Sequence, residues 1–283
     1  MRDAALQGLA VGFFDGVHLG HQAILKGANA ALTFRNHPLT ILAPEKAPRL
    51  IMSVEERVAA IKACDVKDVT VLDFTPELAA LAPVEFAERY LSPSVSRLQA
   101  SIRCGANWRF GKGGAGDAAF LRERGLAVEV VPYAEYKGGH ISSSRIRAAL
   151  ESGAVEDANA MMGRRYEVRG TREEGKGLGR QIGYPTVNFR LDDLNLKLPC
   201  GVYEIELDGI KGVANYGFAP TMGDRSWKKP ILEVHLLDFH PPSLIPHPSS
   251  PISFVRFIRP ERKFDSVEDL KRQIAADCAT IAI

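Results

Sequence analysis

The chain has 283 residues, of which 46% are apolar and 25% are charged. This length exceeds the size at which a single hydrophobic core usually stops growing, so we expect two domains. The net charge of +2 comes from 36 basic and 34 acidic residues, and it gives no electrostatic reason to expect nucleic acid as the main partner. Four cysteines without paired spacing indicate neither a zinc site nor a disulfide framework.

The sequence also bears on location. The N-terminal segment contains Asp3 and Asp15 and lacks a small-residue cleavage site, so it does not look like a signal peptide. No stretch approaches the roughly 18 uninterrupted apolar residues that a membrane-spanning helix needs. We therefore expect a cytoplasmic protein without a membrane partner. The oligomeric state stays open, and a homo-oligomer is compatible with the sequence.

The first half alternates short β-rich runs with segments of helical pattern, which is typical of a parallel sheet covered by helices. One helix is well marked, because Ser53 and Glu56 have capping-box spacing and Val54, Val58 and Ile61 then fall on one face. The predicted strands are Leu9–Phe14, Ala31–Phe34, Val69–Phe74, Ser101–Cys104 and Val128–Pro132.

After about residue 165 the pattern changes. Apolar and polar residues alternate strictly in Tyr203–Leu207, as on a half-buried antiparallel strand. Several such strands favour a small antiparallel β-barrel, and Ser266 is expected to cap a closing helix. A helical join is expected over Ser142–Met162, with domains at 1–160 and 161–283. The other strand candidates are Tyr166–Thr171, Gly212–Tyr216, Leu232–Phe239 and Ile252–Ile258.

The strongest local signal in the first half is the run GFFDGVHLGH, Gly12–His21, between a predicted strand and a predicted helix. Backbone N–H groups at a helix start attract anions, and glycines let phosphates approach the main chain. His18 and His21 would lie on one face of the first turn and stabilise charge developing on an α-phosphate and a leaving pyrophosphate, as in nucleotidyl transfer. Ordinary turn residues or a stray metal pair are the alternatives. The expected nucleotide contacts here are Gly12, Phe14, Asp15, Gly16 and Gly20.

A second phosphate-binding motif, ISSSRIR, occupies Ile141–Arg147 at the start of a predicted helix. Three hydroxyls and two guanidiniums in that position make a phosphate clamp, whereas a solvated basic turn is the alternative. We expect Arg145 to be catalytic. The expected nucleotide-binding residues of this motif are Ser142, Ser143, Ser144 and Arg147.

Both motifs, with LTFRNHP (Leu32–Pro38) and GANWRFGKGGAGD (Gly105–Asp117), resemble the FMN adenylyltransferase domain of bacterial bifunctional riboflavin kinase/FAD synthetases. In the second half, GKGLGRQIGYPTVN, PCGVY, VANYG and LEVHLLDF resemble, in that order, the riboflavin kinase module of the same enzymes. The resemblance covers nearly the whole chain. It implies a Rossmann-like nucleotidyltransferase domain before the β-barrel, and an enzyme that converts riboflavin to FMN and FMN to FAD with ATP and Mg²⁺.

In the second half, the glycine-rich approach to Pro185 offers backbone amides to ATP phosphates. By resemblance, Thr186 and Asn188 help hold the magnesium, and Glu233 takes the proton from the terminal ribityl hydroxyl of riboflavin. For the glycine-rich segment, a plain β-turn is the alternative. For Glu233, the alternative is an exposed strand face that it would share with His235. The expected nucleotide-binding residues are Gly175, Lys176, Gly177, Gly179 and Arg180.

Flavin is expected at the glycine-rich stretch after residue 105. The aromatic faces of Trp108 and Phe110 suit an isoalloxazine ring. By resemblance Asn107 and Arg109 also face flavin, and His37 lies near the nucleotide. A mobile surface loop is the alternative.

The chain departs from the resemblance at four places: a short spacing from His21 to Thr33, Arg35-Asn36 where an acidic residue and proline are common, Ala219 in place of a frequent arginine, and a proline-rich run after Phe239. The last change lies near the expected kinase site. Two rival functions therefore stay open. One is an FAD synthetase whose kinase domain is degenerate, and the other is a catalytically silent flavin-binding or regulatory protein.

Overall fold

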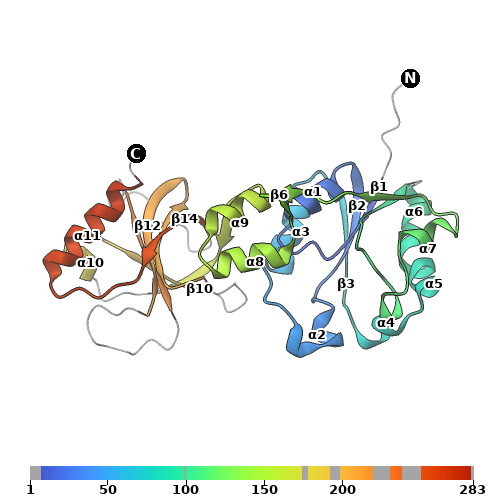
Figure 1. The fold of residues 1–283 in the computed structure, drawn as a ribbon, viewed down its shortest axis with the longest axis horizontal. Helices are drawn as coiled ribbons and strands as arrows, with labels where there is room; N and C mark the ends of the chain where they lie inside the picture. The colour runs from blue at the N-terminus through green and yellow to red at the C-terminus, as the bar shows by residue number, and fades with distance from the viewer. Residues whose placement is uncertain are drawn as a thin grey trace, which may run out of the picture. The chain divides into compact units, whose positions relative to one another are not determined.

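A computed structural model describes residues 8–98, 100–173, 178–191, 198–218, 230–237 and 250–281. The chain divides into two compact units, Met1–Ser143 and Ser144–Ile283, which we call the first and second unit (Figure 1). Across the described ranges, no helix is both long and apolar enough to cross a bilayer. Three predicted stretches, Gly175–Gly177, Ala219–Thr221 and Asp238–Ser249, lie outside the described residues.

The first unit is built on a five-stranded parallel sheet with the strand order β3-β2-β1-β4-β5. The order reverses between β1 and β4, and ligands of such sheets bind beyond the carboxyl ends of the strands at this switch point. The GFFDGVHLGH run follows β1 directly. The strands are β1 Gly8–Val11, β2 Ala28–Phe34, β3 Asp68–Leu72, β4 Ser101–Gly105 and β5 Val128–Val131.

Helices cover both faces of this sheet (Figure 1). On one face Leu9 and Val11 pack with Phe86 of α5, and on the other Ala10 packs with Ile61 of α3. The predicted parallel sheet covered by helices is confirmed. The helical segments are α1 Leu19–Leu25, α2 Leu39–Leu42, α3 Val54–Lys62, α4 Pro76–Ala80, α5 Pro83–Phe86, the π-helical turn Ala87–Leu91, α6 Ser92–Leu98 and α7 Ala118–Arg122, with short 3₁₀ turns at Pro44–Lys46 and Lys112–Gly114.

Helix α3 has the predicted capping box, but its burial differs from the apolar pattern. The capping box is confirmed, because Ser53 Oγ accepts from Glu56 N at 3.2 Å and Glu56 Oε2 accepts from Ser53 N at 2.9 Å. The burial along the helix is less than the apolar pattern suggests at its first turns, and it includes a cation. Arg57 and Ile61 are the buried residues of the helix, whereas Val54 and Val58 are only half-buried.

The second unit contains a seven-stranded antiparallel sheet, ordered β8-β14-β11-β12-β13-β10-β9, and a C-terminal helix, which confirms the predicted fold class. Two strands more than predicted are present: Tyr166–Thr171 divides into β8 and β9, and β10 was not anticipated. The strands are β8 Tyr166–Val168, β9 Gly170–Glu173, β10 Val187–Leu191, β11 Gly201–Leu207, β12 Ile210–Gly217, β13 Ile231–Leu236 and β14 Ile252–Pro260.

Strand β11 differs from the half-exposed strand expected at Tyr203–Leu207. Glu204 is buried, and its Oε2 accepts from Arg256 Nε at 2.6 Å. The alternation therefore reflects a buried carboxylate that is paired with a half-buried arginine, and not a solvent face. The helical segment predicted between the two halves consists of two helices, α8 Ser143–Glu151 and α9 Val155–Met162. Gly153 turns the chain between them with a φ of +83°. Helix α11, Val267–Ala279, begins after Ser266 as predicted.

Candidate active sites

The loop after β1 has a strained backbone. Phe14 and Val17 have φ of 58° and 38°, and Gly16 has φ of 82°. A positive φ is unfavourable for an aromatic or β-branched residue, and such strain concentrates at functional sites. At Gly16 the φ of 82° is what requires glycine, and a Cβ there would also press on the Ile51 side chain, with Cδ1 at 2.8 Å.

Hydrogen bonds hold this loop to distant parts of the first unit. The buried carboxylate of Asp15 accepts from Ile51 N at 3.0 and 3.2 Å, and the Asp15 carbonyl accepts from Ser143 Oγ at 2.8 Å. Thr33 Oγ1 donates to the Phe13 carbonyl at 2.9 Å. Parts of three motifs that are far apart in the sequence thus meet at one end of the parallel sheet.

The two predicted histidines lie together at the start of α1. His18 is the N-cap, and its Nδ1 accepts from His21 N at 3.2 Å while the two rings stack with centroids 3.6 Å apart. Within the described residues, Nδ1 of the half-buried His21 is shielded from solvent and has no hydrogen-bond partner. Burial, then His18 and Arg57, lower the pKa of His21 well below its usual value. His21 is therefore a neutral imidazole near pH 7.

His37 follows the neighbouring strand β2. Its Nδ1 accepts from Leu39 N at 3.1 Å, and its ring meets Phe13 edge-on at a centroid distance of 4.8 Å. Because β1 and β2 are adjacent and parallel, His37 lies beside the loop that carries His18. The sheet topology thus brings two of the residues expected near the nucleotide to the same edge of the sheet.

The ISSSRIR motif begins helix α8 at Ser143. A short hairpin, β6 Glu135–Tyr136 with β7 Gly139–His140, stands between β5 and this helix and was not predicted. Ser142 and Ser143 belong to the first unit, whereas Ser144 and the two arginines, Arg145 and Arg147, belong to the second.

The two aromatic residues predicted to bind flavin differ in exposure. Phe110 is only 6% exposed and belongs to the core, whereas Trp108 is half-buried and stacks on it with ring centroids 4.7 Å apart. Asn107 and Arg109 are exposed, and Arg109 donates to the Trp108 carbonyl at 3.0 Å. Trp108 therefore presents the accessible ring, and Phe110 supports it from below.

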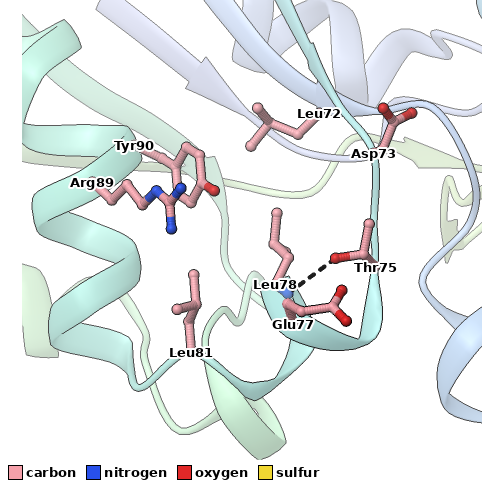
Figure 2. A pocket seen from close by; sticks show the side chains of 8 residues that line it. All are labelled: Leu72, Asp73, Thr75, Glu77, Leu78, Leu81, Arg89 and Tyr90. Carbon is pink, nitrogen blue, oxygen red and sulfur yellow. Dashed lines mark hydrogen bonds between the residues drawn. The ribbon is translucent and has the colours of Figure 1, made fainter.

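An open pocket with a cavity volume of about 280 Å³ lies beyond the end of β3 (Figure 2). At its edge Thr75 Oγ1 accepts from Leu78 N at 3.2 Å and caps α4. Tyr90 contacts Phe86 with centroids 5.2 Å apart, and Phe86 in turn contacts Phe110. No sequence pattern indicated this pocket, because its residues carry no recognisable motif and meet only when the chain after β3 folds back. They are Leu72, Asp73, Thr75, Glu77, Leu78, Leu81, Arg89 and Tyr90.

In the second unit, a row of polar residues crosses three neighbouring strands. Asn188 of β10 pairs with Glu233 of β13, and Glu233 pairs with Asn215 of β12. Directly opposite residues point to the same face of a sheet, so the three side chains are neighbours. Within the described residues, the buried Oδ1 of Asn188 has no hydrogen-bond partner.

A second carboxylate, not found by sequence analysis, completes this row. Asn215 Nδ2 donates to Glu261 Oε1 at 3.3 Å, just after β14. A Cβ on Gly217 would lie 1.7 Å from the same oxygen, so any larger residue there would force the Glu261 carboxylate out of its present position. Burial first, and then the negative charge of Glu261, raise the pKa of Glu233, while the hydrogen bond from Asn215 opposes this rise.

The segment before β10 packs against His235, which shares a face of β13 with Glu233. His235 Nδ1 lies 2.9 Å from the Pro185 carbonyl, within hydrogen-bond distance. A Cβ on Gly179 would lie 2.3 Å from the Tyr184 carbonyl oxygen and 3.2 Å from Thr186 Oγ1, so the loop closes tightly on itself. The alternative of an exposed strand face does not fit this packing. Arg180 is exposed on the short helix α10, Leu178–Gln181, which lies before the turn to Pro185.

The first unit therefore has the architecture of a nucleotide-binding α/β domain with a candidate transfer site at its switch point, and the second is an antiparallel β domain with a carboxylate-amide site. Family models agree: residues 3–145 match FAD synthetase and residues 162–282 match riboflavin kinase. The chain belongs to the bifunctional riboflavin kinase/FMN adenylyltransferase family.

Relatives support this assignment over the full length. The bifunctional riboflavin kinase/FMN adenylyltransferase of Bacillus subtilis is 33% identical, with 95% of this chain and 89% of the relative covered. The enzyme of the same name from Escherichia coli K12 is 32% identical, with coverage of 95% and 90%. A crystal structure described as the macrolide-efflux protein from Streptococcus pneumoniae has a TM-score of 0.83 and 29% identity, and covers 98% of this chain and 94% of its own.

Proposed function

We propose that this chain catalyses both steps of flavin cofactor synthesis. Riboflavin and ATP give FMN and ADP, and FMN and a second ATP give FAD and pyrophosphate. The supporting observation is the presence, in one chain, of the stacked His18–His21 pair after β1 and of the Asn188–Glu233–Asn215 row. We assign the first activity to residues 161–283 and the second to residues 1–160.

In the adenylyl step, an FMN phosphate oxygen forms a bond to the α-phosphorus of ATP and the bond to pyrophosphate breaks. The attacking phosphate is already ionised and needs no base, so the site has to position the substrates and stabilise charge. A neutral imidazole donates one N–H, which suits His18 and His21 to an α-phosphate oxygen. We assign phosphate binding to Ser142–Ser144, Arg145 and Arg147 and nucleotide contacts to His37 and Gly12–Gly20.

For the flavin of this step we propose Trp108, with Asn107 and Arg109 beside it. The half-buried indole, stacked on Phe110, offers one rigid face to a flat ring, and Arg109 offers a cation to a phosphate. The pocket in Figure 2 is lined in part by Tyr90, which contacts Phe86, and Phe86 in turn contacts Phe110 beneath the indole.

In the kinase step, we propose that Glu233 accepts the proton of the terminal ribityl hydroxyl as the hydroxyl oxygen bonds to the γ-phosphorus and ADP leaves. The raised pKa of Glu233 makes it a stronger base than an exposed carboxylate. The unpartnered Oδ1 of Asn188 suits a cation, so Asn188 and Thr186 would hold Mg²⁺. When bound, Mg²⁺ would neutralise the ATP phosphates. We assign the phosphates themselves to Gly175–Arg180.

The substrates proposed here are small molecules, and the net charge of +2 favours no nucleic-acid partner. ATP and riboflavin are both available in the cytoplasm, where we propose that the enzyme acts.

The test is to incubate the purified chain with riboflavin and MgATP and to separate the flavins by chromatography over time. FMN should appear first and FAD should follow. Formation of FAD from supplied FMN, but of no FMN from riboflavin, would favour the FAD synthetase with a degenerate kinase domain. Flavin binding in calorimetry without formation of either product would favour a silent flavin-binding protein.

A further inference from the structure

We infer that Arg57 is a positioning residue of the adenylyl-transfer site, holding the loops after β1 and β2 in place around His21. This inference rests on the site proposed above. Arg57 lies on α3 and belongs to none of the motifs that resemble the family, and it contacts both loops from beneath.

The side chain of Arg57 is an unusual core residue. It is 0% exposed, and its Nη2 donates to the Phe34 carbonyl at 2.5 Å and the Arg35 carbonyl at 3.1 Å. Among the described residues, its Nε and Nη1 are buried without a hydrogen-bond partner. A buried cation with unmatched donors is costly for a fold, and apolar side chains of similar volume often replace buried charges without loss of stability. Folding alone therefore does not explain Arg57.

Its contacts reach both substrate-binding loops. Of the two carbonyls that it binds, that of Phe34 belongs to the last residue of β2 and that of Arg35 to the next residue. They precede His37 by three and two residues. The guanidinium carbon also lies 4.2 Å from the ring centroid of Phe13, which meets His37 edge-on at 4.8 Å. One side chain thus fixes the end of β2 and the start of the loop after β1.

The charge of Arg57 acts on the same site. Asp15 and Glu55 favour its charged form, although burial lowers its pKa. The ionisable groups that act on His21 are His18 of its own loop and Arg57 of α3, and both oppose protonation of His21. Arg57 therefore helps to hold His21 neutral, and its positive charge also complements an incoming triphosphate.

The experiment compares Arg57→Met, Arg57→Lys and Lys62→Met in the full-length protein. Lys62 is an exposed cation on the same helix and serves as the matched control. FMN formation from riboflavin, measured in each preparation, reports whether the chain is folded and active. We expect Arg57→Met to keep the wild-type melting temperature and FMN formation while kcat for FAD formation falls about 30-fold or more, as for a lost positioning contact.

The pH profile separates positioning from general destabilisation. In Arg57→Met the acid limb of FAD formation should move to higher pH, because His21 loses a neighbouring cation that lowers its pKa. Arg57→Lys keeps the charge and should keep the wild-type limb, with a smaller loss of kcat. Lys62→Met should change nothing.

Wild-type FAD kinetics and an unshifted acid limb in Arg57→Met would overturn the inference. If Arg57→Met fails to fold and so loses both activities, Arg57→Lys decides: wild-type kcat in that folded variant would also overturn it, because a lysine has no planar guanidinium to lie over the Phe13 ring while it binds the two carbonyls. A wild-type protein that forms no FAD would instead overturn the proposed function.

Discussion

The imidazole of His18 lies flat against that of His21, 3.6 Å away between ring centroids, and this contact limits their combined charge. Two imidazolium ions at this separation would repel strongly, so the pair cannot easily be doubly protonated. The contact favours a pair in which both rings are neutral or only one of them is charged. The first two predictions follow from this contact.

Replacing either ring should remove FAD formation selectively. We expect His21→Ala to lower kcat for FAD formation by about 10²–10³-fold, the usual loss when one stabilising donor is removed. His18→Asn keeps an N-cap acceptor for His21 N but removes the ring, so it should cost activity without melting α1. The measurement is FAD formed from FMN, with FMN formed from riboflavin as the internal control. A folded His21→Ala protein that loses both activities would show that the two sites are coupled.

Acid should destabilise the first unit through His21. The pKa of His21 is lowered on folding, so below the unfolded value of about 6.5 the unfolded chain binds more protons than the folded chain. The free energy of unfolding therefore decreases as the pH is lowered. We expect the melting temperature of wild type to fall more steeply from pH 7 to pH 5.5 than that of His21→Gln. Parallel curves for the two proteins would contradict a depressed pKa.

Glu233→Gln should separate activity from stability in the second unit. Loss of the proposed base should slow FMN formation by about 10²–10⁴-fold, while FAD formation from FMN is unchanged. Because the pKa of Glu233 is raised on folding, ionising it opposes folding as pH rises. At pH 7 the neutral glutamine should therefore match or raise the melting temperature. A destabilised variant would indicate a structural role for the carboxylate instead.

The space at Gly217 can be tested by a double substitution. Gly217→Ala places a Cβ 1.7 Å from the present position of Glu261 Oε1, and we expect a loss of about 1–3 kcal/mol of unfolding free energy. Adding Glu261→Ala should recover part of that loss, as measured by urea unfolding. If the losses in unfolding free energy from the two single substitutions simply add in the double variant, the two residues do not interact.

Local patterns in the sequence predicted much of this fold. The capping box at Ser53 and the cap at Ser266 were readable because their partners lie only three residues away. The histidine pair was equally local, since a three-residue spacing at a helix start places both rings on one face. Family resemblance supplied Asn188 and Glu233, which no spacing rule would have joined.

The errors arose where a partner was distant in the sequence. Arg57 was missed because a helical pattern shows which face is inward but not that a cation on it will find the carbonyls of Phe34 and Arg35. Glu204 was expected at a solvent face because its partner Arg256 lies on another strand. Glu261 was missed for the same reason, since only the folded sheet brings it to Asn215.

The row Asn188–Glu233–Asn215 has a consequence for how this sequence can vary. Side chains alternate between the faces of a strand, so inserting or deleting one residue within β13 would turn Glu233 away from both asparagines at once. Changes of length are tolerable only in the connections outside the paired segments. The length of β13 therefore matters to the site as much as the carboxylate itself does, and the loops are the places where an inserted residue would leave the row intact.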